Sequence, residues 1–240
     1  MKKFLLLFIA GVFSINASSQ KIYTLTVPRE VVCIAGGGTA IGISFALHHH
    51  TSAFTPDQIS TLDVSRVRAF DRFATRHYSA SARRGSDFML FSSMVVPLLL
   101  LTDPAIRRNA PEVSLILGEV MLVNAGLTLL TKELAHRPRP FVFNPQAPMA
   151  DKIQQDARLS FFSGHTSTVA ALTFSTAKIW SDYHPDSRWR PVVWVGACII
   201  PAVTGYLRMR GGKHYLSDVL AGFAVGAVTG MLIPQWHRRR

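Results

Sequence analysis

Six long apolar segments, more than any other feature, decide what this chain can fold into. They span residues 31–47, 88–102, 113–131, 163–181, 191–207 and 215–235. An α-helix needs roughly 20 predominantly apolar residues to cross the hydrocarbon core of a bilayer, and several of these segments are a little shorter. The pattern predicts an all-α fold, a bundle of six transmembrane helices, because a helix satisfies its own backbone hydrogen bonds inside lipid.

The balance of charge agrees with a membrane protein and excludes two other classes. Charged residues make up 17% of the chain and hydrophobic residues 48%, which excludes a disordered chain. The net charge of +12 could indicate nucleic-acid binding, but the basic residues lie between apolar segments and not on one polar face. We therefore expect no nucleic-acid partner, and no obligate protein partner is inferred. Cys33 and Cys198 lie in apolar segments without metal-ligand spacing and are interpreted as buried thiols.

The first nineteen residues have the composition of a targeting segment. Residues 1–19 combine two lysines at the start, an apolar core and small side chains at positions 17 and 19. This pattern predicts a secretory signal peptide, and an uncleaved membrane anchor is the alternative.

The rest of the chain is expected to have three parts. Residues 20–87 hold the first apolar segment and a polar stretch, 48–87, which is predicted to form an amphipathic helix along the membrane surface. The three consecutive histidines 48–50 are interpreted as a solvated loop and not as a metal site, because adjacent side chains on a helix point in different directions. Residues 88–236 form the main helical bundle, and residues 237–240 form a basic tail.

Small and polar residues inside the segments predict helix packing. Gly222, Gly226 and Gly230 recur every four residues, which puts them on one face where another helix backbone can approach closely. Glu119 and Asn124 lie within the third segment, where polar groups are costly in lipid. We expect both to face the bundle interior and to form structural hydrogen bonds.

The first of three polar clusters follows the third segment. Residues 132–140 contain Lys132 and Arg139 among several basic side chains. Taken alone, such a stretch is typical of the basic residues that flank a membrane helix.

The second cluster, residues 160–167, opens the fourth segment. If Ser163 is the N-cap, the first helical turn presents free backbone N–H groups and the positive end of the helix dipole, which together bind an anion. Gly164 would let a ligand approach the backbone, and His165 would be placed to donate a proton to a leaving group. A plain helix cap followed by an interfacial histidine explains this cluster equally well.

The third cluster, residues 208–218, joins the fifth and sixth segments. His214 and Asp218 are four residues apart, so on a helix the carboxylate could accept a proton from the imidazole and leave the other ring nitrogen as a nucleophile. Gly211 and Gly212 would supply the bend that brings Arg208 over the same place.

The alternating direction of successive helices predicts that these clusters lie together. In an antiparallel bundle, the end of the third segment, the start of the fourth, the end of the fifth and the start of the sixth emerge on one side of the membrane. Fixed cations, a helix N-terminus, a proton donor and an oriented nucleophile are the parts that phosphoryl transfer requires.

At these residues the sequence resembles the type 2 phosphatidic acid phosphatase (PAP2) family, which shares its fold with vanadium haloperoxidases and bacterial non-specific acid phosphatases. The family motifs K-x6-R-P, P-S-G-H and S-R-x5-H-x3-D agree with this chain in order and spacing, at Lys132 with Arg139–Pro140, at Ser163–His165, and at Arg208, His214 and Asp218. The resemblance covers roughly residues 85–235. Two positions depart from it, because Phe162 replaces the proline and Leu207 replaces the serine.

The resemblance implies a phosphatase that needs no metal and no cofactor. His214 would attack phosphorus and form a phosphohistidine, and Asp218 would orient it. His165 would protonate the leaving oxygen and then activate water. The remaining groups would bind the phosphoryl oxygens: Lys132, Arg139, Arg208, the Ser163 hydroxyl and the Gly164 amide.

The expected substrate is a phosphomonoester or diphosphate of a lipid, because the site would lie at the membrane boundary. The candidates are phosphatidic acid, phosphatidylglycerol phosphate, undecaprenyl diphosphate and the phosphates of lipid A, and the sequence does not choose among them. Three other functions stay open: a soluble periplasmic acid phosphatase of the same superfamily, a vanadium haloperoxidase, and an inactive membrane scaffold.

We expect an integral protein of a bacterial inner membrane with its site facing the periplasm. This orientation puts the arginines at 107, 108, 188, 190 and 238–240 inside, as the positive-inside rule prefers. A cleaved signal followed by six spans gives the opposite orientation and leaves the arginine-rich stretch 48–87 inside. One premise must therefore fail: the signal is not cleaved, or it pairs with the segment 31–47, or that segment does not span.

Overall fold

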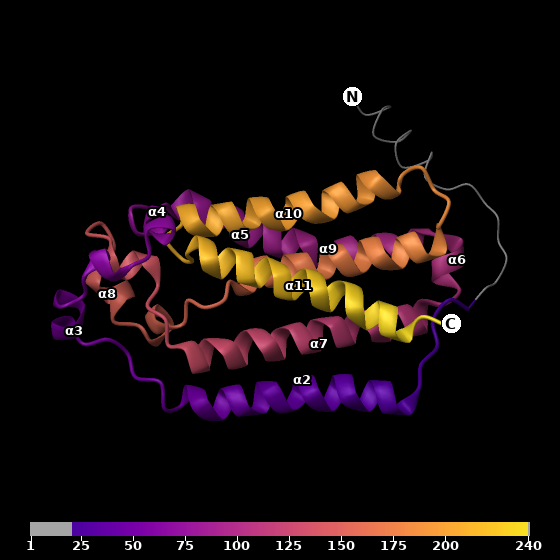
Figure 1. The fold of residues 1–240 in the computed structure, drawn as a ribbon, viewed down its shortest axis with the longest axis horizontal. Helices are drawn as coiled ribbons and strands as arrows, with labels where there is room; N and C mark the ends of the chain where they lie inside the picture. Colours follow the sequence, from indigo (N-terminus) through magenta and orange to yellow (C-terminus); the bar gives the residue numbers. More distant parts are fainter. Residues whose placement is uncertain (1–20, 240) are drawn as a thin grey trace.

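The protein is a bundle of long helices that lie side by side along one axis (Figure 1). The structure is a computed structural model, and it describes residues 21–239. The long helices of this part are α2 (Val27–His48), α5 (Ala80–Ser93), α7 (Ala110–Ala135), α9 (Gly164–Tyr183), α10 (Arg190–Arg210) and α11 (Leu216–His237). No β-strand occurs between residues 21 and 239, so the expected all-α fold is confirmed.

Short helices connect the long ones. They are α3 (Pro56–Ser60), α4 (Arg72–Thr75), α6 (Pro104–Arg107) and α8 (Met149–Lys152), with five 3-10 turns: η1 (Val64–Arg66), η2 (Ala69–Asp71), η3 (Val96–Thr102), η4 (Pro140–Phe143) and η5 (Gln155–Arg158). An isolated antiparallel bridge pairs Tyr23 with Arg238. We call the end of the bundle that holds this bridge the far end. The site end is the opposite one, where α7 and α10 finish and α9 and α11 begin (Figure 1).

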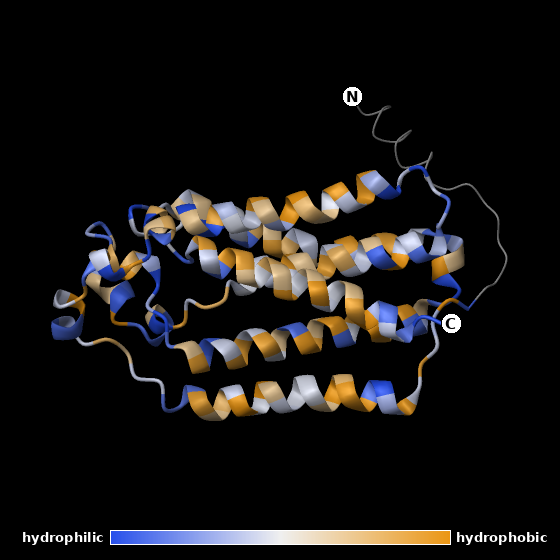
Figure 2. Cartoon of the chain, viewed as in Figure 1, coloured by the Kyte–Doolittle hydropathy of each residue, from blue (hydrophilic) through white to orange (hydrophobic). Residues whose placement is uncertain are grey.

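Five helical segments of the described chain are long and apolar enough to cross a membrane. They are Val27–His48, Ala80–Thr102, Ala110–Phe143, Arg190–Arg210 and Leu216–His237. Large apolar side chains on these helices are exposed, and the outer helices are mostly apolar along their length (Figure 2). Contiguous apolar exposure of this extent marks a lipid-facing surface, and the chain is an integral membrane protein.

The helix α9 differs from the other long helices, and the expectation of six spans is only partly met. It packs against α5, α7, α10 and α11, and most of its side chains are buried. Serine and threonine side chains such as Thr166, Ser167 and Thr173 are among them, and α9 is not among the five candidate spans. A helix enclosed by protein on several sides can carry such polar residues because its surroundings, and not lipid, meet their hydrogen bonds.

The seam between α9 and α11 is a backbone contact, as the glycine repeat predicts. A Cβ atom added at Gly222 would lie 2.5 Å from the carbonyl oxygen of Ser163, and one at Gly230 would lie 2.7 Å from that of Ala171. A side chain at these positions would therefore force the two helices apart. The backbone N–H of Ser163 also donates to the carbonyl of Asp218 over 3.0 Å, which ties the start of one helix to the start of the other.

The stretch 48–87 is not the single amphipathic helix that its sequence predicts. It contains α3, η1, η2, α4 and the first part of α5. The reason is local: the Thr55 side chain accepts from the backbone N–H of Gln58, and Asp63 accepts from that of Ser65. Side chains that satisfy nearby backbone groups in this way compete with a continuous helix.

Other sequence-based expectations have mixed outcomes. Asn124 is buried and accepts a hydrogen bond from the Ser167 hydroxyl over 2.5 Å, as expected. Glu119 is also buried, as expected, but its carboxylate lies 3.3 Å from His237 Nε2 as an ion pair, and the expected structural hydrogen bonds do not form. Cys33 is buried, whereas Cys198 is exposed on α10, contrary to expectation. The predicted signal peptide, residues 1–19, lies outside the described residues.

Candidate active site

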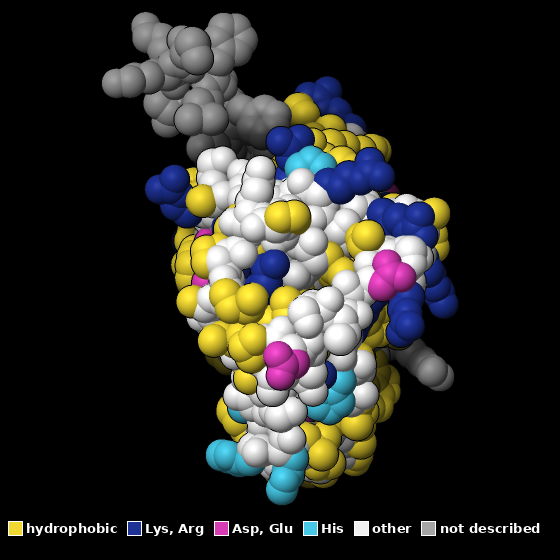
Figure 3. All heavy atoms as spheres, turned by 90° about the vertical axis from the view of Figure 1, so that its left-hand side faces the viewer, with side chains coloured by type: hydrophobic (Ala, Val, Ile, Leu, Met, Phe, Trp, Pro, Cys, Tyr) yellow, Lys and Arg dark blue, Asp and Glu magenta, His cyan; other side chains and the backbone are white. Residues whose placement is uncertain are grey.

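The three polar clusters meet at the site end, around one pocket. The pocket has a volume of 490 Å³, and residues of all three clusters line it together with Asp156. The residues from the clusters are Lys132, Glu133, Arg139, Gly164, His165, Arg208 and His214. Lys and Arg side chains also gather along one side of this end of the molecule (Figure 3). The three clusters therefore lie at the same end of the bundle, as the order of the apolar segments predicts.

The first cluster enters the pocket because α7 ends abruptly. His136 adopts the left-handed conformation, with φ of 42°, and its backbone N–H donates to the carbonyl of Lys132. A left-handed residue at this position is a common way to stop a helix. Lys132 thus remains on the last helical turn, while Arg139 lies beyond it, just before η4.

The second cluster begins α9 as predicted, with one difference at Ser163. The Ser163 oxygen caps the helix by accepting from the backbone N–H of Thr166. Its side chain is fully buried and does not line the pocket, so the structure does not bring this hydroxyl to the cations. Gly164 does line the pocket, and it occupies the first helical position, where the backbone N–H has no partner within the helix.

The third cluster is shaped by a glycine turn. Gly212 has φ of +68°, and its carbonyl accepts from the backbone N–H of Phe141 over 2.9 Å. A side chain here would also collide with the carbonyl of His77. This turn lets Arg208, on the last turn of α10, and His214, just before α11, face the same pocket.

The protonation of His214 follows from its contacts. Its Nδ1 atom lies 2.8 Å from the Ser160 carbonyl oxygen, which can only accept, so Nδ1 carries a hydrogen. Its Nε2 atom lies 3.2 Å from an Arg139 guanidinium nitrogen. Burial, together with the cations Arg139, Lys132 and Arg208, holds the pKa of the His214 imidazole well below its ordinary range. The ring is therefore neutral, with a lone pair on Nε2.

Asp218 does not accept a hydrogen bond from His214, contrary to expectation. Its nearer oxygen lies 3.7 Å from Nδ1, because α11 begins at Leu216 and His214 precedes the helix. The carboxylate instead accepts from the Ser160 hydroxyl over 2.6 Å and from Arg137. Asp218 thus provides negative charge beside the imidazole, whereas the Ser160 carbonyl orients it.

Arg137 holds two buried carboxylates. It pairs with Asp218 and, over 2.8 Å, with Asp71 at the end of η2. Asp71 also accepts from the backbone N–H and the hydroxyl of Ser217, over 2.9 and 2.7 Å. This network links the stretch 48–87 to the first turn of α11. In the sequence Arg137 is one of several basic residues that flank the third apolar segment, and no motif marks Asp71 as its partner.

His165 has a partner that the sequence analysis missed. Its Nε2 atom lies 2.8 Å from an Asp87 carboxylate oxygen, on α5. A carboxylate can only accept, so Nε2 carries a hydrogen and Nδ1 is the ring atom left for proton exchange. Arg208 donates to the same Asp87 oxygen over 3.3 Å. Asp87 therefore positions an imidazole and a guanidinium together.

The cations of the pocket are only partly neutralised. Arg139 donates to Asp156 over 2.6 Å, and Lys213 lies 3.7 Å from the same carboxylate. Burial alone would raise the pKa of Asp156, but Arg139 and Lys213 lower it. Burial and the charge of Arg139 also lower the pKa of Lys213, to about 8. The Lys132 ammonium donates to the Leu159 carbonyl over 2.7 Å, and a carbonyl brings no compensating charge.

The arrangement is suited to a multiply charged anion. Three cations, Lys132, Arg139 and Arg208, face one pocket that also exposes a neutral imidazole. The Nε atom of Arg208 is buried without a hydrogen-bond partner, so this guanidinium retains donor capacity. Fixed donors in a low-dielectric site stabilise developing negative charge without having to reorganise.

The comparisons with known proteins identify the family of this chain. The sequence profile of the PAP2 superfamily matches residues 113–240, which is more than half of the chain. The chain belongs to the PAP2 superfamily. The family and the membrane-type fold support a membrane phosphatase. Among solved structures, a transmembrane PAP2 type phosphatidylglycerolphosphate phosphatase from Bacillus subtilis matches with a TM-score of 0.45 and 20% identity, over 98% of this chain and 92% of that chain.

Proposed function

We propose that this protein hydrolyses the phosphate or diphosphate of a lipid through a phosphohistidine intermediate. The observation that carries the proposal is the single pocket at which two imidazoles, His165 and His214, meet three cations. The site residues take the roles that their motifs predict, with two changes: Ser163 is a helix cap and not a ligand, and the Ser160 carbonyl, not Asp218, orients His214.

The first half-reaction transfers the phosphoryl group to the protein. The lone pair on Nε2 of His214 attacks phosphorus as the bond from phosphorus to the leaving oxygen breaks. The imidazole gains positive charge, which the neighbouring Asp218 carboxylate, 3.7 Å from Nδ1, stabilises. Burial and Arg208 lower the pKa of His165 to about 4, so its ring takes up an Nδ1 proton together with the phosphate, whose negative charge offsets the neighbouring cations. His165 then gives this proton from Nδ1 to the leaving oxygen, and Asp87 holds its ring in position.

The second half-reaction reverses these roles with water. His165, now without its Nδ1 proton, accepts one from a water molecule as the water oxygen attacks phosphorus. The bond between phosphorus and Nε2 breaks, inorganic phosphate leaves, and His214 is neutral again. The Ser160 carbonyl keeps the hydrogen on Nδ1 throughout, so the nucleophilic nitrogen is restored without a tautomer change.

Metal independence is proposed from the donor set. The carboxylates that line the pocket already have partners: Asp156 pairs with Arg139, and Glu133 accepts from His48 and Thr51, each over 2.7 Å. Magnesium needs free oxygen ligands, whereas the exposed donors here are cationic. Lys132, Arg139 and Arg208 therefore take the role that metal ions have in other phosphatases.

A lipid substrate is proposed from the apolar part of the pocket. Phe45 of α2 and Leu129 of α7 line it beside the cations. Phe45 is exposed on an outer helix, so an acyl or prenyl chain in the bilayer reaches the pocket from the side while its phosphate contacts Lys132. Phosphatidic acid, phosphatidylglycerol phosphate, undecaprenyl diphosphate and the phosphates of lipid A all satisfy this chemistry.

The decisive experiment measures phosphate release by the purified protein in excess EDTA, with a lipid phosphate and its short-chain analogue. We expect EDTA to leave phosphate release undiminished, and we expect the long-chain lipid phosphate to be hydrolysed faster than its short-chain analogue. In a separate experiment with substrate labelled in its phosphate, an alkaline quench of the His165→Asn variant should trap labelled phosphohistidine. Activity that is lost with EDTA and restored by magnesium would contradict metal independence. Equal turnover of both substrates would favour the soluble type of acid phosphatase, and turnover that needs vanadate would indicate a haloperoxidase.

We also propose an inner-membrane location with the site end facing the periplasm. The arginines at 107, 108, 188, 190, 238 and 239 lie at the far end, as the positive-inside rule prefers for a cytoplasmic face. Tyr23 lies at the far end too, paired with Arg238, so this orientation is incompatible with a cleaved signal peptide before it. In a background with Cys33→Ser and Cys198→Ser, a membrane-impermeant thiol reagent should label Asp57→Cys and not Asp186→Cys in intact cells. The reverse pattern would overturn the orientation.

A further inference from the structure

A second polar cluster lies at the far end, away from the pocket. It consists of Glu30 of α2, Glu119 of α7 and His237 of α11, and it joins three helices that are distant in sequence. The ligand atoms of these side chains all lie within 4.8 Å of one another. Nothing in the proposed phosphatase reaction uses them.

The geometry of His237 directs one ring nitrogen at both carboxylates. Its Nδ1 atom lies 2.9 Å from the carbonyl oxygen of Ile233, which can only accept, so Nδ1 carries a hydrogen. Its Nε2 atom lies 3.0 Å from a Glu30 oxygen and 3.3 Å from a Glu119 oxygen. A lone pair on Nε2 would repel both ionised carboxylates, so a positive charge must lie between them: a proton, held by Nε2 or by one of the carboxylates, or a metal ion.

The burial of Glu119 indicates that one proton on His237 does not neutralise the charge of the cluster. The Glu119 side chain is 1% exposed, and among the described residues no nitrogen or oxygen donor gives either carboxylate oxygen a hydrogen bond; the weak donor beside it is the Cys33 thiol. In the described part of the chain, His237 is the basic group in ion-pair contact with both carboxylates. One positive charge leaves two carboxylates with an excess negative charge, and an uncompensated buried charge is costly.

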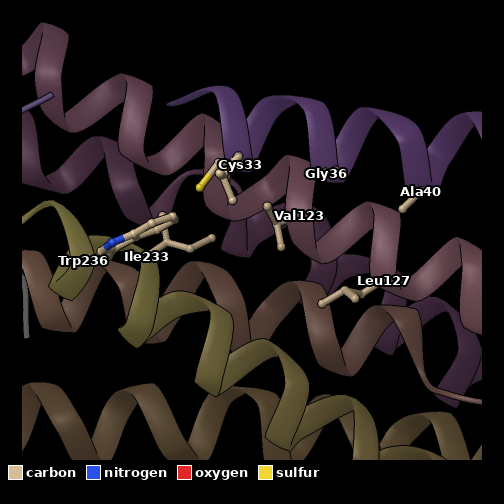
Figure 4. Close-up of a pocket in the computed structure, with 9 residues that line it drawn as sticks. Cys33, Gly36, Ala40, Val123, Leu127, Ile233 and Trp236 are labelled. Carbon is tan, nitrogen blue, oxygen red and sulfur yellow. The ribbon is translucent and has the colours of Figure 1, made fainter. Parts of the chain in front are cut away.

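The surroundings increase that cost because they are apolar. A pocket of 360 Å³ lies between α2, α7 and α11 beside the cluster, and its lining includes Cys33, Val123, Ile233 and Trp236 (Figure 4). Ile233 is the residue whose carbonyl accepts from His237. A charge here has little water to solvate it, whereas a divalent cation bound to two carboxylates and a neutral imidazole leaves the cluster neutral.

We propose that Glu30, Glu119 and His237 bind a divalent transition-metal ion of the zinc class. The 3.3 Å separation of Nε2 from the Glu119 oxygen matches the edge of a tetrahedron whose bonds are about 2.0 Å long, and the 3.0 Å separation from the Glu30 oxygen is a few tenths of an ångström shorter. The hydrogen bond from Nδ1 to a backbone carbonyl is the usual support for a metal-bound histidine. The ion would hold α2, α7 and α11 together at the far end.

Zinc is favoured over magnesium and calcium by the donor types. Imidazole nitrogen suits zinc and its neighbours, whereas magnesium and calcium prefer oxygen ligands alone. The buried thiol of Cys33, one helical turn after Glu30, lies beside both carboxylates and adds a soft donor to the surroundings. The Glu30 side chain is 15% exposed, which gives an ion a path to the cluster.

The test measures zinc in the purified protein, in detergent and without a histidine tag. His49 and His50 are exposed and would bind zinc adventitiously, so both are replaced by alanine in every sample. After exhaustive dialysis we expect about one zinc ion per chain, and at least a tenfold loss in Glu119→Gln and in His237→Asn. Glu112→Gln is the matched control, because Glu112 is on the same helix and pairs with Lys21 outside the cluster. It should retain its zinc.

A second readout covers variants that fold poorly. Protein with the three cluster residues intact is first stripped of zinc with a chelator. Adding zinc back should raise the melting temperature of this protein by several degrees, because a ligand that binds only the folded state stabilises it. Protein that retains no zinc and shows no melting shift would overturn the proposal, and so would Glu119→Gln protein that retains as much zinc as the control. Those results would indicate that protons neutralise the cluster. Neither readout depends on phosphatase activity.

Discussion

The two ends of the bundle bury charge of opposite sign. At the site end, Lys132, Arg139 and Arg208 surround a pocket in which the carboxylates already have partners. At the far end, Glu30 and Glu119 share one histidine. Buried charge is costly in either case unless it is compensated. The uncompensated charge at each end therefore indicates a ligand of the opposite charge: an anion at the positive site end and a cation at the negative far end.

The largest expected effect is the loss of activity when a histidine is replaced at the site end and not at the far end. Replacing the proposed nucleophile, His214→Ala, should lower kcat by roughly 10⁴-fold or more, because the covalent step has no substitute. Steady-state assays measure this, and His184→Asn, a far-end histidine that pairs with Asp103, is the control. The zinc content of His214→Ala should equal that of the unsubstituted protein. Substantial residual turnover would contradict the phosphohistidine mechanism.

Removing one cation at the site end should have the next largest effect. Arg208→Gln is expected to lower kcat/KM by about 10²–10³-fold, because one fixed donor to the phosphoryl group is lost. Arg208→Lys should restore part of the activity, since the charge returns without the second nitrogen. If Arg208→Gln binds vanadate, a phosphoryl mimic, as tightly as the unsubstituted protein does, the guanidinium is not at the anion site.

Asp87 should have a smaller effect, and one that is specific to proton transfer. Asp87→Asn is expected to lower kcat by roughly 10–100-fold, because His165 loses the acceptor that fixes its ring. A substrate with a good leaving group, such as a nitrophenyl phosphate, needs less protonation and should lose less activity. An equal loss with both substrates would show that Asp87 acts only through Arg208.

The smallest effect is a pH dependence at the site end. With a pKa of about 8, Lys213 is charged below pH 8 and loses its charge above it. The positive potential over the pocket then falls, and kcat/KM should decline several-fold on the alkaline side with an apparent pKa near 8. Lys213→Arg should move this decline to higher pH. A decline that stays at the same pH in this variant would exclude Lys213 as its source.

Much of the site could be predicted because it depends on spacing within short motifs and on helix parity. Lys132, Arg139, His165, Arg208 and His214 line one pocket as the motifs suggested. The order of the apolar segments alone put their ends together, without any knowledge of packing.

Contacts between distant segments could not be predicted. Asp87 and His165 are 78 residues apart, and no local pattern marks the carboxylate. The error at Asp218 has a local cause: the four-residue spacing assumes a helix that includes His214, whereas α11 begins two residues later. The arginine-rich stretch 48–87 does not follow its apolar spacing, because the capping side chains of Thr55 and Asp63 start separate short helices within it.

The close backbone contact between α9 and α11 affects how these two helices respond to a change in bilayer thickness. Transmembrane helices respond to a thinner or thicker bilayer by tilting, and helices joined through side chains can slide as rotamers adjust. Here the carbonyl of Ser163 meets Gly222 directly, so no side chain is present to take up the movement. The helix that carries His165 and the helix that His214 precedes should tilt as one body. The spacing of the two imidazoles would then be insensitive to the lipid composition around them.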